Sequence, residues 1–124
     1  MYCIVSIKHS RQGDTPHQYI TLWRHNDAGC TWNLNEAGKY DFSKIQEHLN
    51  YYHNGESTVA VLRDRLESMV TVAMPGTLDS WKTALVIENT YGNWEKIRNP
   101  FFSYGLEQPE NFENPVRKAY NERN

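Results

Sequence analysis

Length, composition and charge limit what this chain can be. Its 124 residues suit one domain that buries a core without disulfides or metal. The 13 basic and 15 acidic residues leave a formal net charge of -2, which gives no electrostatic footprint for generic nucleic-acid binding. The same charge is too mild for a phosphate-mimicking acidic surface. Aromatic residues make up 13% of the chain, which argues against general disorder.

Three strand-like runs predict an antiparallel meander near the N-terminus. Residues 2–8, 18–24 and 30–34 are rich in aromatic, aliphatic and β-branched side chains, and turn-forming residues separate them. Because the first run begins at the start of the chain, we expect it to be paired inside the sheet. Alternation along the second run places Ile20 and Leu22 on one face.

The second and third runs predict a hairpin with a loop over residues 25–29. Asn26 bonds its own backbone readily and Gly29 tolerates positive φ, so both suit such a loop. Alternation in the third run predicts a shared face for Cys30, Trp32 and Leu34.

Helical spacing predicts two or three short helices after the hairpin. Asp41 or Ser43 can cap a helix over about 42–51. Its apolar stripe comprises Phe42, Ile45, Leu49 and Tyr52. A second helix is predicted over 62–70, and residues 88–90 cap a third that carries Trp94 and Ile97 and ends at Asn99-Pro100.

The remaining segments complete an α+β prediction: a small antiparallel sheet packed with those helices. Residues 57–61 predict a short strand and 71–74 an extended segment, while 78–88 fits a helix or a strand equally well. We expect a single domain over residues 1–107. Residues 108–124 are polar and predict a partly docked tail, in which Pro115 suits the start of a short helix.

The sequence offers no catalytic or metal-binding constellation. The five histidines lack HExxH spacing, and the two cysteines are too far apart for CxxC. The glycines form no dinucleotide-binding or phosphate-binding loop, and no GxSxG elbow is present. We therefore expect no enzyme activity, no cofactor and no metal site.

The cysteines and the hydropathy pattern predict a cytoplasmic protein. Cys3 and Cys30 both lie in apolar runs, and we expect them to be reduced core thiols. No stretch approaches the ~20 apolar residues that span a bilayer, and no signal peptide is evident. We expect a soluble chain without membrane partners.

Aromatic, amide and guanidinium groups gather near the hairpin turn and predict a binding site. Trp23, Arg24 and Trp32 could line a shallow site there, although two indoles in a small domain more often fill its core. Tyr, Trp and Arg are enriched at protein interfaces, and aromatic rings also stack on nucleobases. Since Tyr51 and Tyr52 point apart on a helix, we expect one to be exposed. The candidate binding residues are Trp23, Arg24, Asn26, Trp32, Tyr40, Tyr52, Asn54 and Trp94.

Several strings of the sequence carry a resemblance. They are YITLWR at 19–24, AGCTW at 28–32, AGKY at 37–40, YYHNG at 51–55 and IENTYGNW at 87–94. With them the chain resembles a group of small uncharacterised proteins encoded by bacteriophages and prophages. In that group Pro follows Trp-Arg, whereas this chain has His25. The resemblance implies a phage accessory product that acts in the bacterial cytoplasm and blunts a host system.

Three functions follow as expectations. The first is an inhibitor that binds a host defence complex, for example an anti-CRISPR-type blocker of an effector complex. The second is a protein that sequesters a nucleotide-like signal molecule with Trp23, Arg24 and Trp32. The third is a small enzyme, such as a nuclease or transferase, that uses His and Asp residues. An exposed N-terminal edge strand would also favour a two-fold homodimer.

Overall fold

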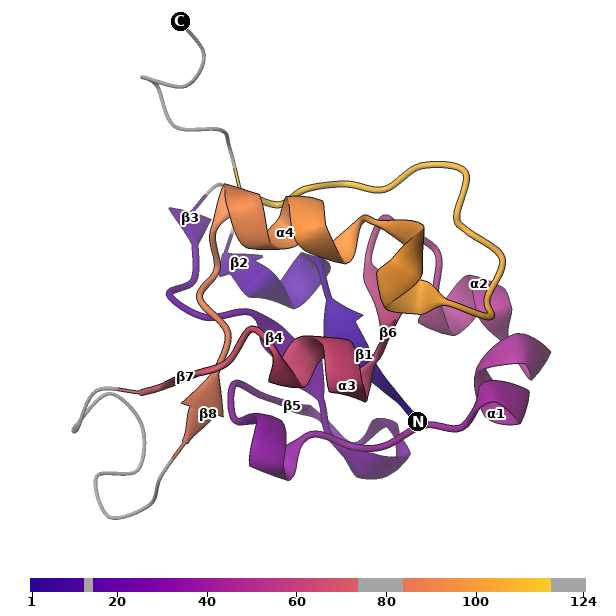
Figure 1. Ribbon diagram of the computed structural model, residues 1–124, viewed down its shortest axis with the longest axis horizontal. Helices are drawn as coiled ribbons and strands as arrows, with labels where there is room; N and C mark the ends of the chain where they lie inside the picture. Colours follow the sequence, from indigo (N-terminus) through magenta and orange to yellow (C-terminus); the bar gives the residue numbers. More distant parts are fainter. Residues whose placement is uncertain (13–14, 74–83, 117–124) are drawn as a thin grey trace, which may run out of the picture.

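Strand β1 (Tyr2–Ser6) lies at the centre of the main sheet, and all of its residues are buried. It pairs on one side with β4 (Thr21–Trp23) and on the other with β6 (Thr58–Leu62), while β5 (Cys30–Thr31) follows β4 at the edge (Figure 1). All three neighbouring pairs are antiparallel. The predicted α+β class, the N-terminal meander and the interior position of the first strand are confirmed.

The computed structural model describes residues 1–12, 15–73 and 84–116. Two smaller sheets pair β2 (Arg11–Gln12) with β3 (Thr15–Pro16), and β7 (Thr71–Val72) with β8 (Leu85–Val86). The helices are α1 (Phe42–Glu47), α2 (Leu49–Tyr52), α3 (Arg63–Glu67) and α4 (Tyr91–Ile97). Short 3-10 turns are η1 (Lys8–Ser10), η2 (His25–Asp27), η3 (Leu34–Glu36) and η4 (Pro100–Ser103).

Alternation along β1 divides the core between the two faces of the sheet. Cys3 and Val5 point to the face covered by α3 and α4, called here the α4 face. Tyr2 and Ile4 point to the face covered by α1 and α2, called the α2 face. Because helices cover both faces, the central strand is apolar on both sides rather than alternating with polar residues.

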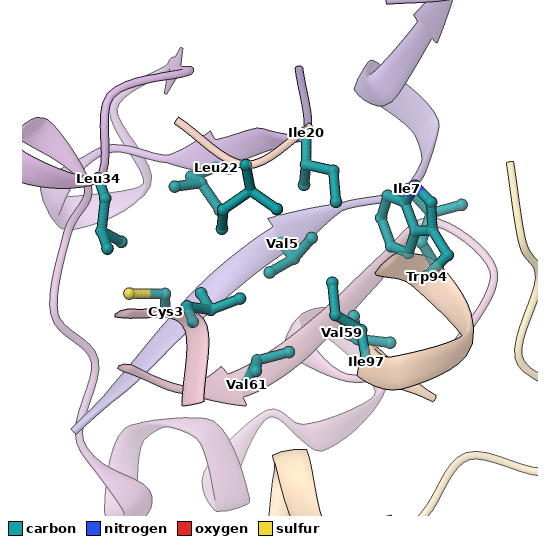
Figure 2. Packing of buried hydrophobic residues seen from close by; sticks show 12 residues of the cluster. Cys3, Val5, Ile7, Ile20, Leu22, Leu34, Val59, Val61, Trp94 and Ile97 are labelled. Carbon is teal, nitrogen blue, oxygen red and sulfur yellow. The ribbon is translucent and has the colours of Figure 1, made fainter. Parts of the chain in front are cut away.

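The α4 face holds the larger apolar core. Side chains from β1, β4 and β6 point into one space, and Trp94 and Ile97 of α4 lie over Val59 (Figure 2). This core comprises Cys3, Val5, Ile7, Ile20, Leu22, Leu34, Val59, Val61, Leu66, Ile87, Trp94 and Ile97. The prediction that Ile20 and Leu22 share a face is confirmed.

The helix predicted over 42–51 is two short helices. Asp41 caps α1 by accepting from the Lys44 N–H at 2.8 Å, but His48 has non-helical angles (φ -132°, ψ 52°) and separates α1 from α2. The predicted stripe assumed one continuous helix. With the break, Tyr52 is buried while Phe42 remains 46% exposed.

The predicted common face of Cys30, Trp32 and Leu34 is wrong. The Asn33 side chain caps η3, so strand alternation stops at Thr31 and does not extend to Leu34. Leu34 joins the core of the α4 face, Trp32 packs beside Tyr19, and Cys30 is exposed. Cys30 is therefore not the core thiol that was expected.

The possible homodimer depended on an exposed edge strand at the N-terminus, and β1 is interior. The edge on that side of the sheet is β6, where the Ala60 N–H donates to His53 Nδ1 at 3.0 Å. The argument for a homodimer through an N-terminal edge therefore falls away.

Residues 108–116 run beside α2 and then back along α4 (Figure 1). The Glu113 N–H donates to the Gly55 carbonyl at 2.7 Å, and Asn114 Nδ2 donates to the Tyr91 carbonyl at 3.2 Å. Gly55 has φ +79°, and a Cβ there would overlap the Asn111 carbonyl.

Two predicted segments lie largely outside the described residues. They are most of the short helix expected after Pro115 and residues 78–83 of the segment that fitted a helix or a strand. Within the latter segment, residues 85–86 form β8.

Candidate functional site

Two buried phenols on the α2 face hold the turn between β4 and β5. The Tyr40 hydroxyl donates to the Arg24 carbonyl at 2.5 Å and accepts from the Asp27 N–H at 2.9 Å. The Tyr52 hydroxyl donates to the Asp27 carboxylate at 3.2 Å. Asn26 and Asp27 have φ of 55° and 58°, which non-glycine residues rarely adopt. The hydrogen bonds from the two tyrosines stabilise this strained turn.

Burial raises the pKa of Tyr40 and the pKa of Tyr52 to about 12, and the nearby Asp27 carboxylate adds to both shifts. Both phenols therefore remain protonated in the fold at neutral pH and can donate. As the pH rises from 10 towards 12, phenols of the unfolded chain ionise first, so the folded state loses stability over that window.

Gly38 brings the chain after β5 against this turn. Its N–H donates to the Trp23 carbonyl at 2.9 Å. A Cβ at Gly38 would lie 2.7 Å from the His25 Cα and 2.8 Å from the Arg24 carbonyl carbon. Because those neighbours are backbone atoms, only glycine fits this approach.

Above the turn, Trp23 and Tyr51 form what is called here the aromatic patch. Their ring centroids lie 5.4 Å apart in an edge-to-face arrangement. Tyr52 lies beneath both, 5.9 Å from Trp23 and 5.0 Å from Tyr51. Trp23 is half-buried and Tyr51 is 55% exposed. The patch thus presents large aromatic area on a base that packing holds in place.

Three hollows in the surface adjoin α2. One of about 220 Å³ lies between η1 and α2 and includes Trp23, Tyr51 and Lys8. A second, of about 470 Å³, lies between α1, α2 and Asp27. A third, of about 420 Å³, lies between α2 and residues 107–111. Tyr51 borders the first two, so the aromatic patch stands on the ridge between them.

The third hollow is lined by Glu56, Glu107 and Glu110, and by the buried His53. Burial lowers the pKa of His53 to about 4, so the ring is neutral at pH 7. Since its Nδ1 accepts from Ala60, the ring proton is on Nε2, which has no hydrogen-bond partner among the described residues.

Three of the predicted binding residues have no exposed ring. Tyr40 and Tyr52 are buried at 2% exposure and act through their hydroxyls on the turn. Trp94 is fully buried on the α4 face, where its Nε1 donates to Asn89 Oδ1 at 2.6 Å. These three rings are therefore part of the core and are not exposed for a partner to contact in this fold.

The other predicted residues lie at the surface but in different settings. Trp32 packs edge-to-face with Tyr19, at 5.5 Å, rather than with Trp23. Arg24 pairs with Glu36 at 3.0 Å, and Asn26 is exposed on the strained turn. The structure therefore does not gather Trp23, Arg24 and Trp32 around one ligand.

Asn54 has a local role in addition to bordering two hollows. Its Oδ1 accepts from the N–H groups of Glu56 and Ser57, each at 2.8 Å, and Nδ2 donates to the Asn50 carbonyl at 3.0 Å. These bonds fix the turn between α2 and β6.

Sequence reasoning missed Lys8, His9 and Asn50, and its candidate set named Tyr52 rather than Tyr51. Helical geometry predicted that one of the two tyrosines is exposed, which is confirmed. No local signal identified η1, because its approach to α2 depends on the pairing of β1 with β6.

The described residues show no arrangement suited to a metal ion. Among residues 1–12, 15–73 and 84–116, no group of three or more His, Cys, Asp or Glu side chains gathers closely enough to hold one. In the same residues, no helix is long and apolar enough to cross a bilayer.

Comparisons of the chain with protein-family models, with curated proteins and with solved structures gave no match. The proposals below therefore rest on the geometry of the α2 face and on the sequence resemblance.

Proposed function

We propose that this protein is a bacteriophage-encoded accessory protein that acts by binding and inhibits a bacterial defence complex in the host cytoplasm. The observation that carries the proposal is the aromatic patch. In this patch an exposed tyrosine packs on a half-buried tryptophan and a buried tyrosine.

Tyr and Trp dominate the binding energy of protein interfaces when they are held rigidly near the centre of a contact. Tyr51 meets this condition, because the rings of Trp23 and Tyr52 support it from below at 5.4 and 5.0 Å. The cost of ordering the side chain on binding is therefore small.

The charges around the patch favour a selective contact over a general one. Asp27, Lys44 and Glu47 border the hollow that Tyr51 also borders, and Arg24, next to Trp23 in the chain, pairs with Glu36. Acidic and basic groups are therefore interspersed around the patch, and a partner must match their positions to bind.

The test measures phage plaque formation on bacterial strains that each carry one defence system. The strain with a CRISPR effector complex is tested first. Expressing the protein should restore plaque formation on the strain whose system it blocks. Tyr51→Ala should abolish this effect and weaken the purified complex about 30-fold or more, as removal of a binding hot spot does.

The matched control is Tyr104→Ala, because Tyr104 is 72% exposed and its side chain lies outside the patch. This variant should keep full activity. The proposal is overturned if no strain is affected, or if Tyr104→Ala loses as much activity as Tyr51→Ala.

A further inference from the structure

We propose that the hollow between η1 and α2 binds a planar ligand with one anionic group, of the class of a nucleoside monophosphate. Binding of this ligand needs no protein partner, so it can be tested separately from the defence inhibition proposed above.

The hollow has one aromatic wall. Trp23 and Tyr51 both border it, and their edge-to-face contact at 5.4 Å leaves no slot between the rings. A planar group can therefore stack on an exposed ring face, but the two rings cannot sandwich it. Base–aromatic stacking is tolerant of base identity, so the wall selects planar rings rather than one particular base.

The charged residues that border the hollow are basic. Lys8 is exposed and has no ion pair among the described residues, and His9 lies next to it on η1. His9 Nδ1 contacts Ser6 Oγ at 3.2 Å, and the ring has no other hydrogen bond within the described chain. Among the described residues, no carboxylate borders this hollow. The Lys8 ammonium group can therefore attract an anionic group of a ligand that stacks on the aromatic wall.

Polar groups on both η1 and the turn after α2 are already fixed by hydrogen bonds. Asn54 Nδ2 donates to Ser57 Oγ at 2.9 Å, and the His9 N–H donates to Ser6 Oγ at 2.9 Å. These contacts hold η1 and the turn after α2 in place without a ligand. A preformed site of this kind loses little entropy when it binds.

Size and surrounding charge limit the ligand further. The hollow has about 220 Å³, below the 300–1,000 Å³ typical of sites for drug-sized molecules. Asn50 and Asn54 separate it from the hollow lined by Glu56, Glu107 and Glu110, where a second phosphate would be repelled. The site therefore suits one ring system with one anionic group rather than a dinucleotide.

The test is an NMR titration of the full-length, ¹⁵N-labelled protein with AMP, GMP, CMP and UMP. At least one should shift the indole N–H resonance of Trp23 more than the resonances of Trp32 and Trp94. The matching nucleoside, which lacks the phosphate, should bind about tenfold more weakly, as should ribose 5-phosphate, which lacks the base.

Two pairs of variants separate the parts of the site. Lys8→Gln should weaken binding of the monophosphate about tenfold and leave the nucleoside unchanged, whereas Lys96→Gln on α4 should change neither. Trp23→Leu should weaken both ligands, whereas Trp32→Leu, which changes an indole outside the hollow, should not.

The inference is overturned if none of the four monophosphates shifts Trp23, if Lys8→Gln has no effect, or if the shifts centre on Trp32. These outcomes leave the plaque assay untouched, so a failure here is distinct from a failure of the proposed defence inhibitor. Conversely, loss of plaque restoration does not alter the nucleotide titration.

Discussion

The two faces of the main sheet use aromatic residues in different ways. On the α4 face, Trp94 is enclosed by aliphatic side chains, and its one polar atom is bonded to Asn89 inside the protein. On the α2 face, Tyr40 and Tyr52 bury their rings but send their hydroxyls out to a surface turn. The comparison shows that an aromatic core can also organise a surface when its rings carry a polar end.

The largest effect is expected from the α4 face. Trp94→Ala should lower the free energy of unfolding by about 3–5 kcal/mol, because it empties a fully buried volume and leaves Asn89 Oδ1 unpaired. Urea denaturation measures it. A loss below about 1 kcal/mol would show that this core is not the main source of stability.

The second largest effect on stability is expected at His53, which is buried after α2. Its pKa is lowered to about 4 in the fold against 6.5 unfolded, so acid protonates the unfolded chain first. Stability should therefore fall by about 3 kcal/mol between pH 6.5 and 4. Urea denaturation across this range tests it, and His53→Gln should remove that part of the pH dependence. An unchanged slope in the variant would contradict the assignment.

A matched pair of hydroxyl deletions sharpens the comparison. Tyr40→Phe removes the hydrogen bonds to the Arg24 carbonyl and from the Asp27 N–H. It should lower the free energy of unfolding by about 1–3 kcal/mol. Tyr52→Phe releases only the carboxylate of the exposed Asp27, which water can solvate, and should cost about 1 kcal/mol or less. Urea denaturation of both variants decides the order, and equal losses would contradict it.

A small effect on stability is expected at Tyr51. Its ring is 55% exposed but packs on Trp23 and Tyr52, so Tyr51→Ala should lower the free energy of unfolding by about 1 kcal/mol. The same variant should weaken partner binding about 30-fold or more. A large loss of stability together with the loss of binding would mean that the ring serves the core, and the contrast between the two faces would be weaker than stated.

The sequence predicted those helices and strands whose ends or apolar runs are marked by neighbouring residues. The apolar run of β1, the caps at Asp41 and Thr90, and the end of α4 before Pro100 all follow from residue chemistry that acts over one or two turns. The break at His48 was not predicted, because no glycine or proline marks it in the sequence.

The sequence named some members of the aromatic patch and missed others. Trp23 was named and lies in the patch, whereas Tyr52 was named in place of its exposed neighbour Tyr51. Trp32 was grouped with Trp23, yet it packs with Tyr19. The sequence pattern around a Trp or Tyr does not show whether its ring is buried in the core or exposed at the surface.

The sequence by itself determined the α+β class, the meander around a buried first strand and the abundance of aromatic residues near one turn. These follow from alternation, turn chemistry and composition, which act locally along the chain. Only the tertiary structure decided that Trp94 and Tyr52 are buried, that Tyr51 is exposed, and that Lys8 and Trp23 border the same hollow. The physical reason is that the exposure of a side chain depends on which distant segments of the chain cover it, and strand pairing brings those segments together.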